Sequence, residues 1–212
     1  MRKYVIGAVL STSILLSGCS IGTSTQEHLT DNLAIVYEEE QGYRDAQERI
    51  AELEKKEQST FNEVMELTQE DKEAVASKVT ELKTSLTERL ALLEKENESI
   101  QGALSSLSSF DKLIEDAKED EKKTLVSLKQ SMEARYEAYE VVYDEYQKLS
   151  TLQTELYDML PNEKTEQVQL QEQVVSVNNQ NELVQSAINA FNETTKEVNE
   201  TKTTVFDTFN EE

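Results

Sequence analysis

The sequence predicts an all-α protein, an elongated antiparallel bundle or coiled coil of three to four long helices. Apolar residues recur at alternating steps of three and four, which places one apolar stripe on each helix. Of the residues that tight turns usually require, only Gly42, Gly102 and Pro161 remain after Gly22. Glu, Lys, Leu, Gln, Ala and Thr dominate the composition, and with this periodicity they favour long helices.

The first helix is expected over about 26–67, where the apolar residues keep the helical step. Thr68 can then accept a backbone N–H bond while Asp71 lies at the third helical position. This arrangement is close to a capping box, and it begins a second helix over about 70–116.

The main reversal of the chain is expected near residues 116–119. Asp116 can cap a new helix there, and the acidic residues that follow it suit a helix N-terminus. Serines are frequent within residues 105–111, which predicts a kink or a short helix before the reversal. The third helix then runs over about 119–160.

Pro161 ends the third helix, because its ring removes a hydrogen-bond donor and pushes Leu160 out of helical geometry. A fourth helix follows over about 163–208. Its apolar stripe is interrupted by Asn181, Thr195 and Lys202. We therefore expect a weaker seam, meaning weaker packing along the line where this helix meets its neighbours, and a frayed C-terminal end.

The four segments have nearly equal lengths, each roughly 65 Å at about 1.5 Å per residue. Short links between such segments favour antiparallel neighbours. Two arrangements stay open. Either all four helices share one core, or three share it and the fourth lies alongside.

The first residues have the layout of an export signal. Arg2 and Lys3 precede an uncharged, mostly apolar run over residues 4–16. At about 13 residues this run is too short to span a bilayer, which takes roughly 20. The sequence Leu-Ser-Gly-Cys at 16–19 resembles the lipobox of bacterial lipoprotein signal peptides.

The lipobox resemblance implies that Cys19 receives a diacylglyceryl group and becomes an acylated, palmitate-type N-terminus after removal of a signal peptide at residues 1–18. Residues 19–25 then form the lipidated start and a tether, and residues 26–212 form the helical domain. Cys19 is the only cysteine, which excludes an intramolecular disulfide. We expect a protein held by lipid on the extracytoplasmic face of the cell membrane.

The charge of the chain restricts its partners. There are 43 acidic and 21 basic residues, a formal net charge of −22. Nucleic acid is disfavoured as a partner because it is bound through Lys and Arg. Anionic lipid head groups and anionic wall polymers are disfavoured unless divalent cations bridge them. Two interpretations stay open: the acidity keeps an exposed protein soluble, or it attracts basic proteins.

No residue pattern predicts catalysis, a metal site or a cofactor. His28 is the only histidine and has no cysteine neighbour for a zinc site. Gly42 and Gly102 stand alone and form no phosphate loop. The acidic runs at 38–40 and 119–121 are interpreted as solvated helix faces, which do not raise a carboxyl pKa as glycosidase chemistry requires. We expect a non-enzymatic protein.

The most distinctive feature is a tyrosine stripe in the third helix. Tyr136, Tyr139, Tyr143 and Tyr146 repeat at steps of 3, 4 and 3. Aromatic stripes can stack on sugars, so glycan binding is one hypothesis. The other is that the stripe lines the seam of the bundle, with each hydroxyl reaching an acceptor at its edge. The helical spacing favours the seam.

Two segments of the same helix carry a family resemblance: residues 132–143 (MEARYEAYEVVY) and residues 155–160 (ELYDML). They are similar to the same region of the YkyA-type cell-wall-binding lipoproteins of Bacillus and its relatives. The order of parts also matches, from the lipobox through the long first helix to the Tyr-rich helix. The resemblance implies a helical surface lipoprotein of a Gram-positive bacterium. It carries no functional residue over.

The expected function is that of a lipid-anchored, non-enzymatic spacer or binding module between membrane and wall. Its partners would be the membrane, through the anchor, and peptidoglycan or envelope proteins. The alternative is an extracytoplasmic folding or assembly factor whose acidic helices shield basic client segments. A pore-forming protein ranks last, because the mature chain has no uninterrupted apolar hairpin.

Overall fold

A computed structural model describes residues 25–68 and 70–210, all of which lie in helices or in the links between them. The predicted all-α class is confirmed, and the described residues contain no strand. The predictions for residues 1–18, for Cys19 and for most of the tether concern residues outside the described ranges. The helices are α1 (Thr25–Glu39), α2 (Gln41–Glu66), α3 (Lys72–Ser106), α4 (Ser109–Asp116), α5 (Glu119–Met159) and α6 (Gln167–Asn210).

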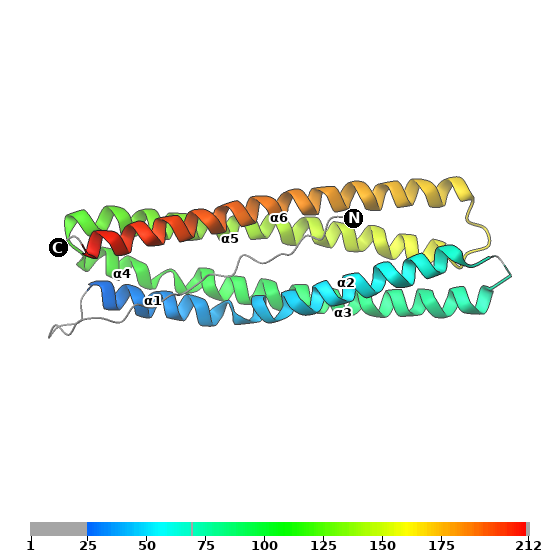
Figure 1. Ribbon diagram of the computed structural model, residues 1–212, viewed down its shortest axis with the longest axis horizontal. Coiled ribbons are helices and arrows are strands. Elements are labelled where there is room, and N and C mark those ends of the chain that lie inside the picture. The colour runs from blue at the N-terminus through cyan, green and yellow to red at the C-terminus, as the bar shows by residue number, and fades with distance from the viewer. Residues whose placement is uncertain (1–24, 69, 211–212) are drawn as a thin grey trace.

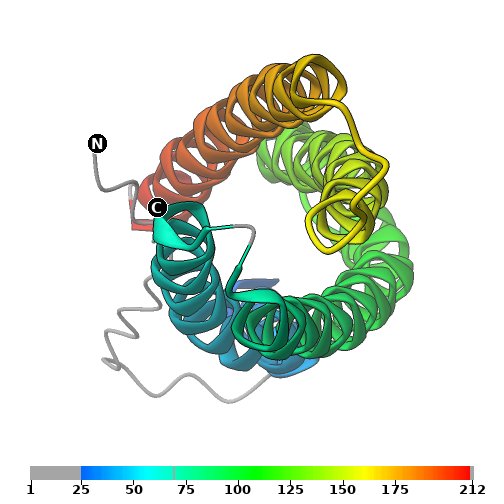
Figure 2. The same ribbon diagram turned by 90° about the vertical axis from the view of Figure 1, so that its right-hand side faces the viewer.

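The helices form two long hairpins that lie face to face (Figure 1). In the first hairpin, α1 and α2 follow one another and pack antiparallel to α3 and α4. In the second, α5 packs antiparallel to α6 along its whole length. Seen from the end, the two hairpins close around a common axis (Figure 2). At about 1.5 Å per residue, the 41 residues of α5 make a rod of roughly 60 Å.

In the half of the rod that contains α1 and α4, helices from all four positions around the bundle axis share one core. Leu29 of α1, Ile100 of α3, Leu125 of α5 and Val198 of α6 are each 0% exposed and belong to one cluster. Burial of such apolar side chains is the main force that holds the layers together. The four-helix arrangement left open by the sequence applies to this half.

The other half, which ends at the links after α2 and α5, is built differently. Its cluster draws buried residues from α2, α3 and α5, among them Val64, Leu82 and Leu156. From α6 it receives only partly buried side chains such as Leu170 and Val174. Here three helices share the core and α6 lies alongside, so each of the two arrangements describes one half of the rod.

The first predicted helix, over 26–67, is interrupted at Glu40, and this expectation is corrected. At that point the hydroxyl of Ser99 on α3 inserts into the series of backbone hydrogen bonds that would otherwise join α1 to α2. The N–H of Tyr43 donates to Ser99 Oγ (3.0 Å), and this hydroxyl donates to the carbonyl of Glu39. A side chain inserted into such a series is a recognised cause of a helix kink.

Gly42 allows the close approach that the interruption requires. A Cβ added there would lie 3.1 Å from Ser99 Cβ, which is tighter than most real contacts. The bonds on either side of the interruption remain, since the N–H of Glu40 donates to Val36 O and the N–H of Arg44 to Glu40 O, both at 3.1 Å. The kink is therefore local, and its consequence is that Glu40 turns into the core.

Two other breaks lie close to where the sequence places them. The serine-rich stretch separates α3 from α4, and the chain reverses between Asp116 and Glu119. At the first link, the backbone N–H and the hydroxyl of Thr68 both donate to Asp71, at 2.9 and 2.8 Å. The helix that follows begins at Lys72 rather than near residue 70.

The last link is longer than predicted, and the expectation that Pro161 pushes Leu160 out of helical geometry is wrong, because Leu160 keeps helical backbone angles (φ −58°, ψ −45°). After Pro161 the chain stays non-helical until Gln167, whereas the sequence predicts a helix from about residue 163. The side chain of Asn162 accepts the N–H of Lys164 (3.0 Å), and that of Gln169 accepts the N–H of Glu166 (3.1 Å). The acceptor of Asn162 stabilises a turn after Pro161, whereas that of Gln169, the third residue of α6, caps the start of the helix at Gln167.

The expectation of a frayed C-terminal end is wrong. The helix continues to Asn210, and Val205 is 0% exposed. Thr195, one of the polar residues that interrupt the stripe, is 1% exposed and accepts a hydrogen bond from Arg135. A polar residue in the stripe strengthens the seam when a buried partner meets it.

Replacing Phe191 by Ala should destabilise the bundle by about 3 to 5 kcal/mol, because this buried ring packs edge-on against Tyr43 and Tyr139 from both hairpins. Urea unfolding followed by circular dichroism measures the loss. Val175→Ala on the same helix, at a side chain 55% exposed, should change stability by less than about 0.5 kcal/mol. Equal effects of the two substitutions would contradict the assignment of Phe191 to the core.

Candidate functional site

The predicted tyrosine stripe lies on the face of α5 that meets the first hairpin. Tyr136, Tyr139 and Tyr146 are buried and Tyr143 is half-buried, so these rings pack in the seam. Tyr157 continues the stripe, and all five hydroxyls donate to carboxylates of the other hairpin: Tyr136 to Glu40 (2.8 Å), Tyr139 to Glu96 (3.1 Å), Tyr143 to Glu94 (2.6 Å), Tyr146 to Glu54 (2.6 Å) and Tyr157 to Glu57 (3.3 Å).

The electrostatics of these contacts keep the tyrosines protonated. Burial raises the pKa of Tyr136, Tyr139 and Tyr146 well above its ordinary value. At the edge of the seam, the hydrogen bond to Glu94 raises the pKa of Tyr143 to about 12. Each hydroxyl therefore acts as a donor at any physiological pH, and the stripe joins the hairpins through directional contacts.

The first of two buried arginines, Arg135 on α5, extends this seam. Its guanidinium contacts Glu40 at 2.5 Å and donates to Thr195 of α6 at 2.9 Å. Arg135 and Glu40 are 1% and 2% exposed. The interpretation of the run 38–40 as a solvated face is therefore wrong for Glu40, because the kink between α1 and α2 turns its carboxylate inward.

The run 119–121 is also corrected at one residue. Glu121 is 5% exposed and lies at the third position of α5. Its carboxylate accepts the backbone N–H of Lys118 (3.0 Å) and the hydroxyl of Thr25 on α1 (3.1 Å). It therefore caps one helix and connects it to another.

The second buried arginine, Arg89 on α3, lies further along the rod. It makes a two-pronged ion pair with Glu57 of α2, with both N···O distances at 2.7 Å. It also donates to Tyr146 (2.5 Å) and to Gln153 (2.8 Å) of α5, and Glu54 lies within ion-pair distance at 3.5 Å. One guanidinium thus ties three helices together.

Sequence reasoning missed these buried charges, although their signal was present. The apolar stripe skips one turn between Val36 and Tyr43, between Leu53 and Phe61, and between Leu93 and Ile100. The skipped positions on the buried face are Glu40, Glu57 and Glu96. A charged residue at an apolar register position indicates a buried ion pair when the partner helix offers Arg or Tyr.

Glu96 differs from the other two because no cation within residues 25–68 and 70–210 contacts it. It is 1% exposed, and it accepts hydrogen bonds from Gln47 (2.5 Å) and Tyr139 (3.1 Å). Burial raises the pKa of this carboxyl to about 8, with a smaller contribution from the charge of Glu54. The side chain is therefore mostly neutral at pH 7.

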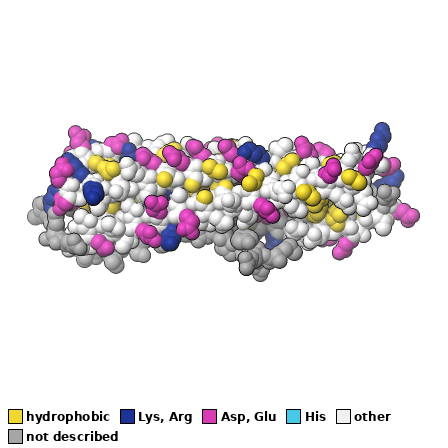
Figure 3. All heavy atoms as spheres, turned by 90° about the horizontal axis from the view of Figure 1, so that it is seen from above, with side chains coloured by type: hydrophobic (Ala, Val, Ile, Leu, Met, Phe, Trp, Pro, Cys, Tyr) yellow, Lys and Arg dark blue, Asp and Glu magenta, His cyan; other side chains and the backbone are white. Residues whose placement is uncertain are grey.

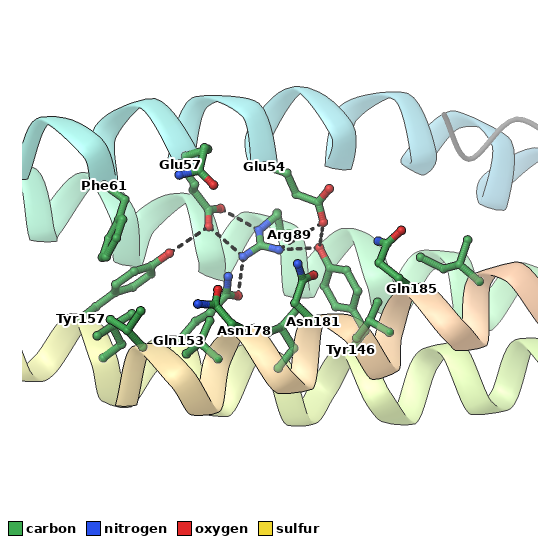
Figure 4. Close-up of a pocket in the computed structure, with 17 residues that line it drawn as sticks. Glu54, Glu57, Phe61, Arg89, Tyr146, Gln153, Tyr157, Asn178, Asn181 and Gln185 are labelled. Carbon is green, nitrogen blue, oxygen red and sulfur yellow. Dashed lines mark hydrogen bonds and ion pairs between the residues drawn. The ribbon is translucent and has the colours of Figure 1, made fainter. Parts of the chain in front are cut away.

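Beside Arg89, a groove of about 370 Å³ opens between α2 and α6; we term it the α2–α6 groove (Figure 4). Arg89 and its partners Tyr146 and Gln153 form its floor. Glu54, Glu57, Gln58 and Phe61 line it from α2. From α6, the side chains of Val174, Val177, Asn178, Asn181 and Gln185 face it. The groove exists because α6 packs at the side of the core in this half of the rod and contributes only partly buried residues to it.

The α6 side of the groove is unusual for this chain. Between Gln167 and Asn192 the helix is rich in Asn and Gln and has only two charged residues, Glu172 and Glu182, whereas 30% of the whole chain is charged. The side-chain amides of Asn178, Asn181 and Gln185 make no hydrogen bond to any other described residue. They are available to a ligand.

The outer surface has a different character. On the face shown in Figure 3, acidic side chains are spread along the whole length among scattered hydrophobic ones. Within residues 25–68 and 70–210, no cluster of three or more His, Asp or Glu side chains has the arrangement of metal ligands. No helix in the same part of the chain combines the length and apolarity that a membrane span requires. We therefore take the α2–α6 groove as the candidate binding site within the described residues.

Comparison with known proteins identifies relatives. Residues 24–208 match the model of the YkyA family, which is described as "Putative cell-wall binding lipoprotein". The chain is also 27% identical over 203 residues to an "Uncharacterized lipoprotein YkyA" of Bacillus subtilis (strain 168), a match that covers 95% of this chain and 91% of the relative. No solved structure matches the chain. The resemblance seen in the sequence is confirmed.

Replacing Glu40 by Ala should cost about 3 to 5 kcal/mol of stability, because it leaves the buried Arg135 without its carboxylate. Glu38→Ala, in the same acidic run but exposed, is the matched control and should cost less than about 0.5 kcal/mol. A combined Glu40→Leu and Arg135→Met variant should recover much of the loss. Chemical unfolding measures the stability of each variant. A Glu40→Ala variant as stable as Glu38→Ala would rule out the buried pair.

The raised pKa of Glu96 predicts a pH-dependent stability. The folded state keeps this carboxyl protonated up to about pH 8, whereas the unfolded chain releases the proton near its ordinary pKa of 4.5. The stabilisation is therefore complete below pH 4.5 and is lost as pH rises through about 8. Relative to Glu96→Gln, the wild type should lose up to about 1.4 kcal/mol per pH unit within that window. Parallel stability curves for the two proteins would show that Glu96 does not titrate as described.

Proposed function

We propose that the chain, which belongs to the YkyA family of lipoproteins, is a lipid-anchored, non-enzymatic module that binds a component of the cell envelope. The observation that carries the proposal is the α2–α6 groove, in which amide groups that have no hydrogen-bond partner among the described residues face a rigid floor. The name of the family supports a wall component as the ligand.

The anchor is the lipobox cysteine, Cys19, with acylation placing the protein on the extracytoplasmic face of the membrane. Helix α1 begins at Thr25, a few residues later, at the end of the rod opposite the links after α2 and α5. At about 1.5 Å per residue, the groove near Glu57 lies roughly 50 Å along the rod from Thr25. The bundle would therefore act as a spacer that presents its groove to the wall.

A binding role rather than catalysis agrees with the state of the buried charges. The carboxylates of Glu40 and Glu57 are held in ion pairs with arginines, and Tyr136, Tyr146 and Tyr157 donate to carboxylates. These groups are committed to contacts between helices. A general acid or base needs freedom to exchange a proton with substrate.

Replacement of Cys19 by Ala tests the anchor. Cells that express the unchanged protein and are fed a labelled fatty acid should yield a labelled protein in the membrane fraction, because a two-chain anchor holds a protein firmly. The Cys19→Ala variant should be unlabelled and absent from that fraction. Ser20→Ala is the control and should behave as the unchanged protein. Acylated, membrane-bound Cys19→Ala would refute this anchor.

Co-sedimentation of residues 20–212 with purified peptidoglycan sacculi tests the binding role. A saturable fraction should sediment with sacculi and remain in solution without them. An unrelated acidic helical protein serves as the control for trapping. Failure to sediment at any sacculus concentration would contradict wall binding.

A further inference from the structure

We propose that the α2–α6 groove binds a glycan strand of neutral, N-acetylated sugars, an inference that rests on the proposed function and specifies its ligand. A glycan presents hydroxyl and acetamido groups around a ring whose faces carry C–H groups. The groove offers matching features, an amide-lined wall, an apolar wall and a fixed carboxylate, in a volume within the range of small-ligand sites.

The amide wall comes from Asn178, Asn181 and Gln185, which lie on one face of α6 at steps of three and four. Each amide has two N–H donors and a carbonyl acceptor. None of these groups is used within the described residues. An acetamido group, with one donor and one acceptor, and a row of hydroxyls are the natural complement of such a wall.

The apolar wall is formed by Phe61 of α2 with Val174 and Val177 of α6. These three side chains are half-buried, and Phe61 points towards the space between the helices (Figure 4). The C–H face of a sugar ring would cover them and remove apolar surface from water. The stacking platform is thus Phe61 rather than the buried tyrosine stripe.

The fixed carboxylate is Glu54, whose side chain is 43% exposed. Its Oε1 accepts the hydroxyl of Tyr146 (2.6 Å) and lies near Arg89, which hold it in one position. The remaining acceptor positions of the carboxylate are open to sugar hydroxyls. Hydrogen bonds to a charged acceptor are stronger than those between neutral groups.

The charge of the groove favours a neutral ligand over an ionic one. Arg89 already donates to Glu57, Tyr146 and Gln153, so it has little capacity left for an anionic group. Conversely, Glu57 is paired with Arg89, so a basic peptide would gain little there. The net charge of −22 adds repulsion against anionic polymers. Uncharged sugars avoid this repulsion and can still use the open acceptor positions of Glu54.

Titration with a soluble oligomer of β-1,4-linked N-acetylglucosamine tests the inference. The protein is the chain from residue 20, which contains all six helices and both core clusters. Calorimetry measures the affinity, and NMR follows the side-chain amide signals. We expect the signals of Asn178 and Asn181 to shift. The variant Asn178→Ala with Asn181→Ala should bind at least about tenfold more weakly, since it removes the hydrogen-bonding groups of two residues of the amide wall.

Asn179→Ala is the matched control, because Asn179 is exposed on the same helix and does not line the groove. It should bind as the unchanged protein does. Both variants should melt at the same temperature as the unchanged protein, since the replaced side chains are exposed. The corresponding glucose oligomer, which lacks acetamido groups, should bind more weakly.

The outcomes separate this inference from the proposed function. If sacculi bind the chain and the double variant binds them equally well, the glycan site is not in the groove and the inference falls while wall binding stands. If sacculi are not bound at all, the proposed function fails. Amide signals that shift with a basic peptide, but not with the sugar oligomer, would overturn the choice of a glycan.

Discussion

The seam between the two hairpins is a row of buried polar contacts, and the rest of the structure depends on satisfying them. Arg89 and Arg135 are each 1% exposed, and a buried charge is tolerated only when partners surround it. Arg135 pairs with Glu40 of the opposite hairpin. Arg89 forms its ion pair with Glu57 inside its own hairpin and donates to Tyr146 and Gln153 of the opposite one. The carboxylates that accept the tyrosine hydroxyls also lie in the opposite hairpin. Apolar contacts alone would allow helices to slide by a turn. A slide here would leave Arg135 and Glu40 unpaired and would break the hydrogen bonds from Arg89 to Tyr146 and Gln153, so only one register of the hairpins meets the constraint.

The same constraint shapes the candidate site. Arg89 draws α2, α3 and α5 together, and these three helices form the core of that half of the rod. The amide-rich start of α6 is left against α5, with its polar face turned to the space beside α2. The groove floor is therefore rigid because it belongs to the seam. The side chains of Asn178 and Asn181 in the wall that would meet a ligand make no hydrogen bond to the described part of the chain, and a site of this kind needs little reorganisation on binding.

Periodicity and composition were enough to predict the fold class and the antiparallel arrangement, because they report which face each helix buries. They did not predict the kink at Glu40, whose cause is a hydroxyl of Ser99 that lies far away in sequence. They placed the tyrosines in the seam but assigned Glu40 and Glu121 to solvent, since a carboxylate in a charged run looks the same whether or not a partner helix supplies a cation or a donor. The groove could not be predicted, because it arises from the path of α6 relative to α2.

The most direct test of the central claim is a distance measurement between spin labels on the two hairpins. Cys19→Ala protein labelled at the exposed positions Met65 of α2 and Val175 of α6 should give one narrow distance distribution. In a variant with Arg89→Met, Arg135→Met, Glu40→Leu and Glu57→Leu, the helices should still form, but the distribution should broaden or split into several distances. An equally narrow distribution in that variant would show that apolar packing alone sets the register, and it would contradict the account.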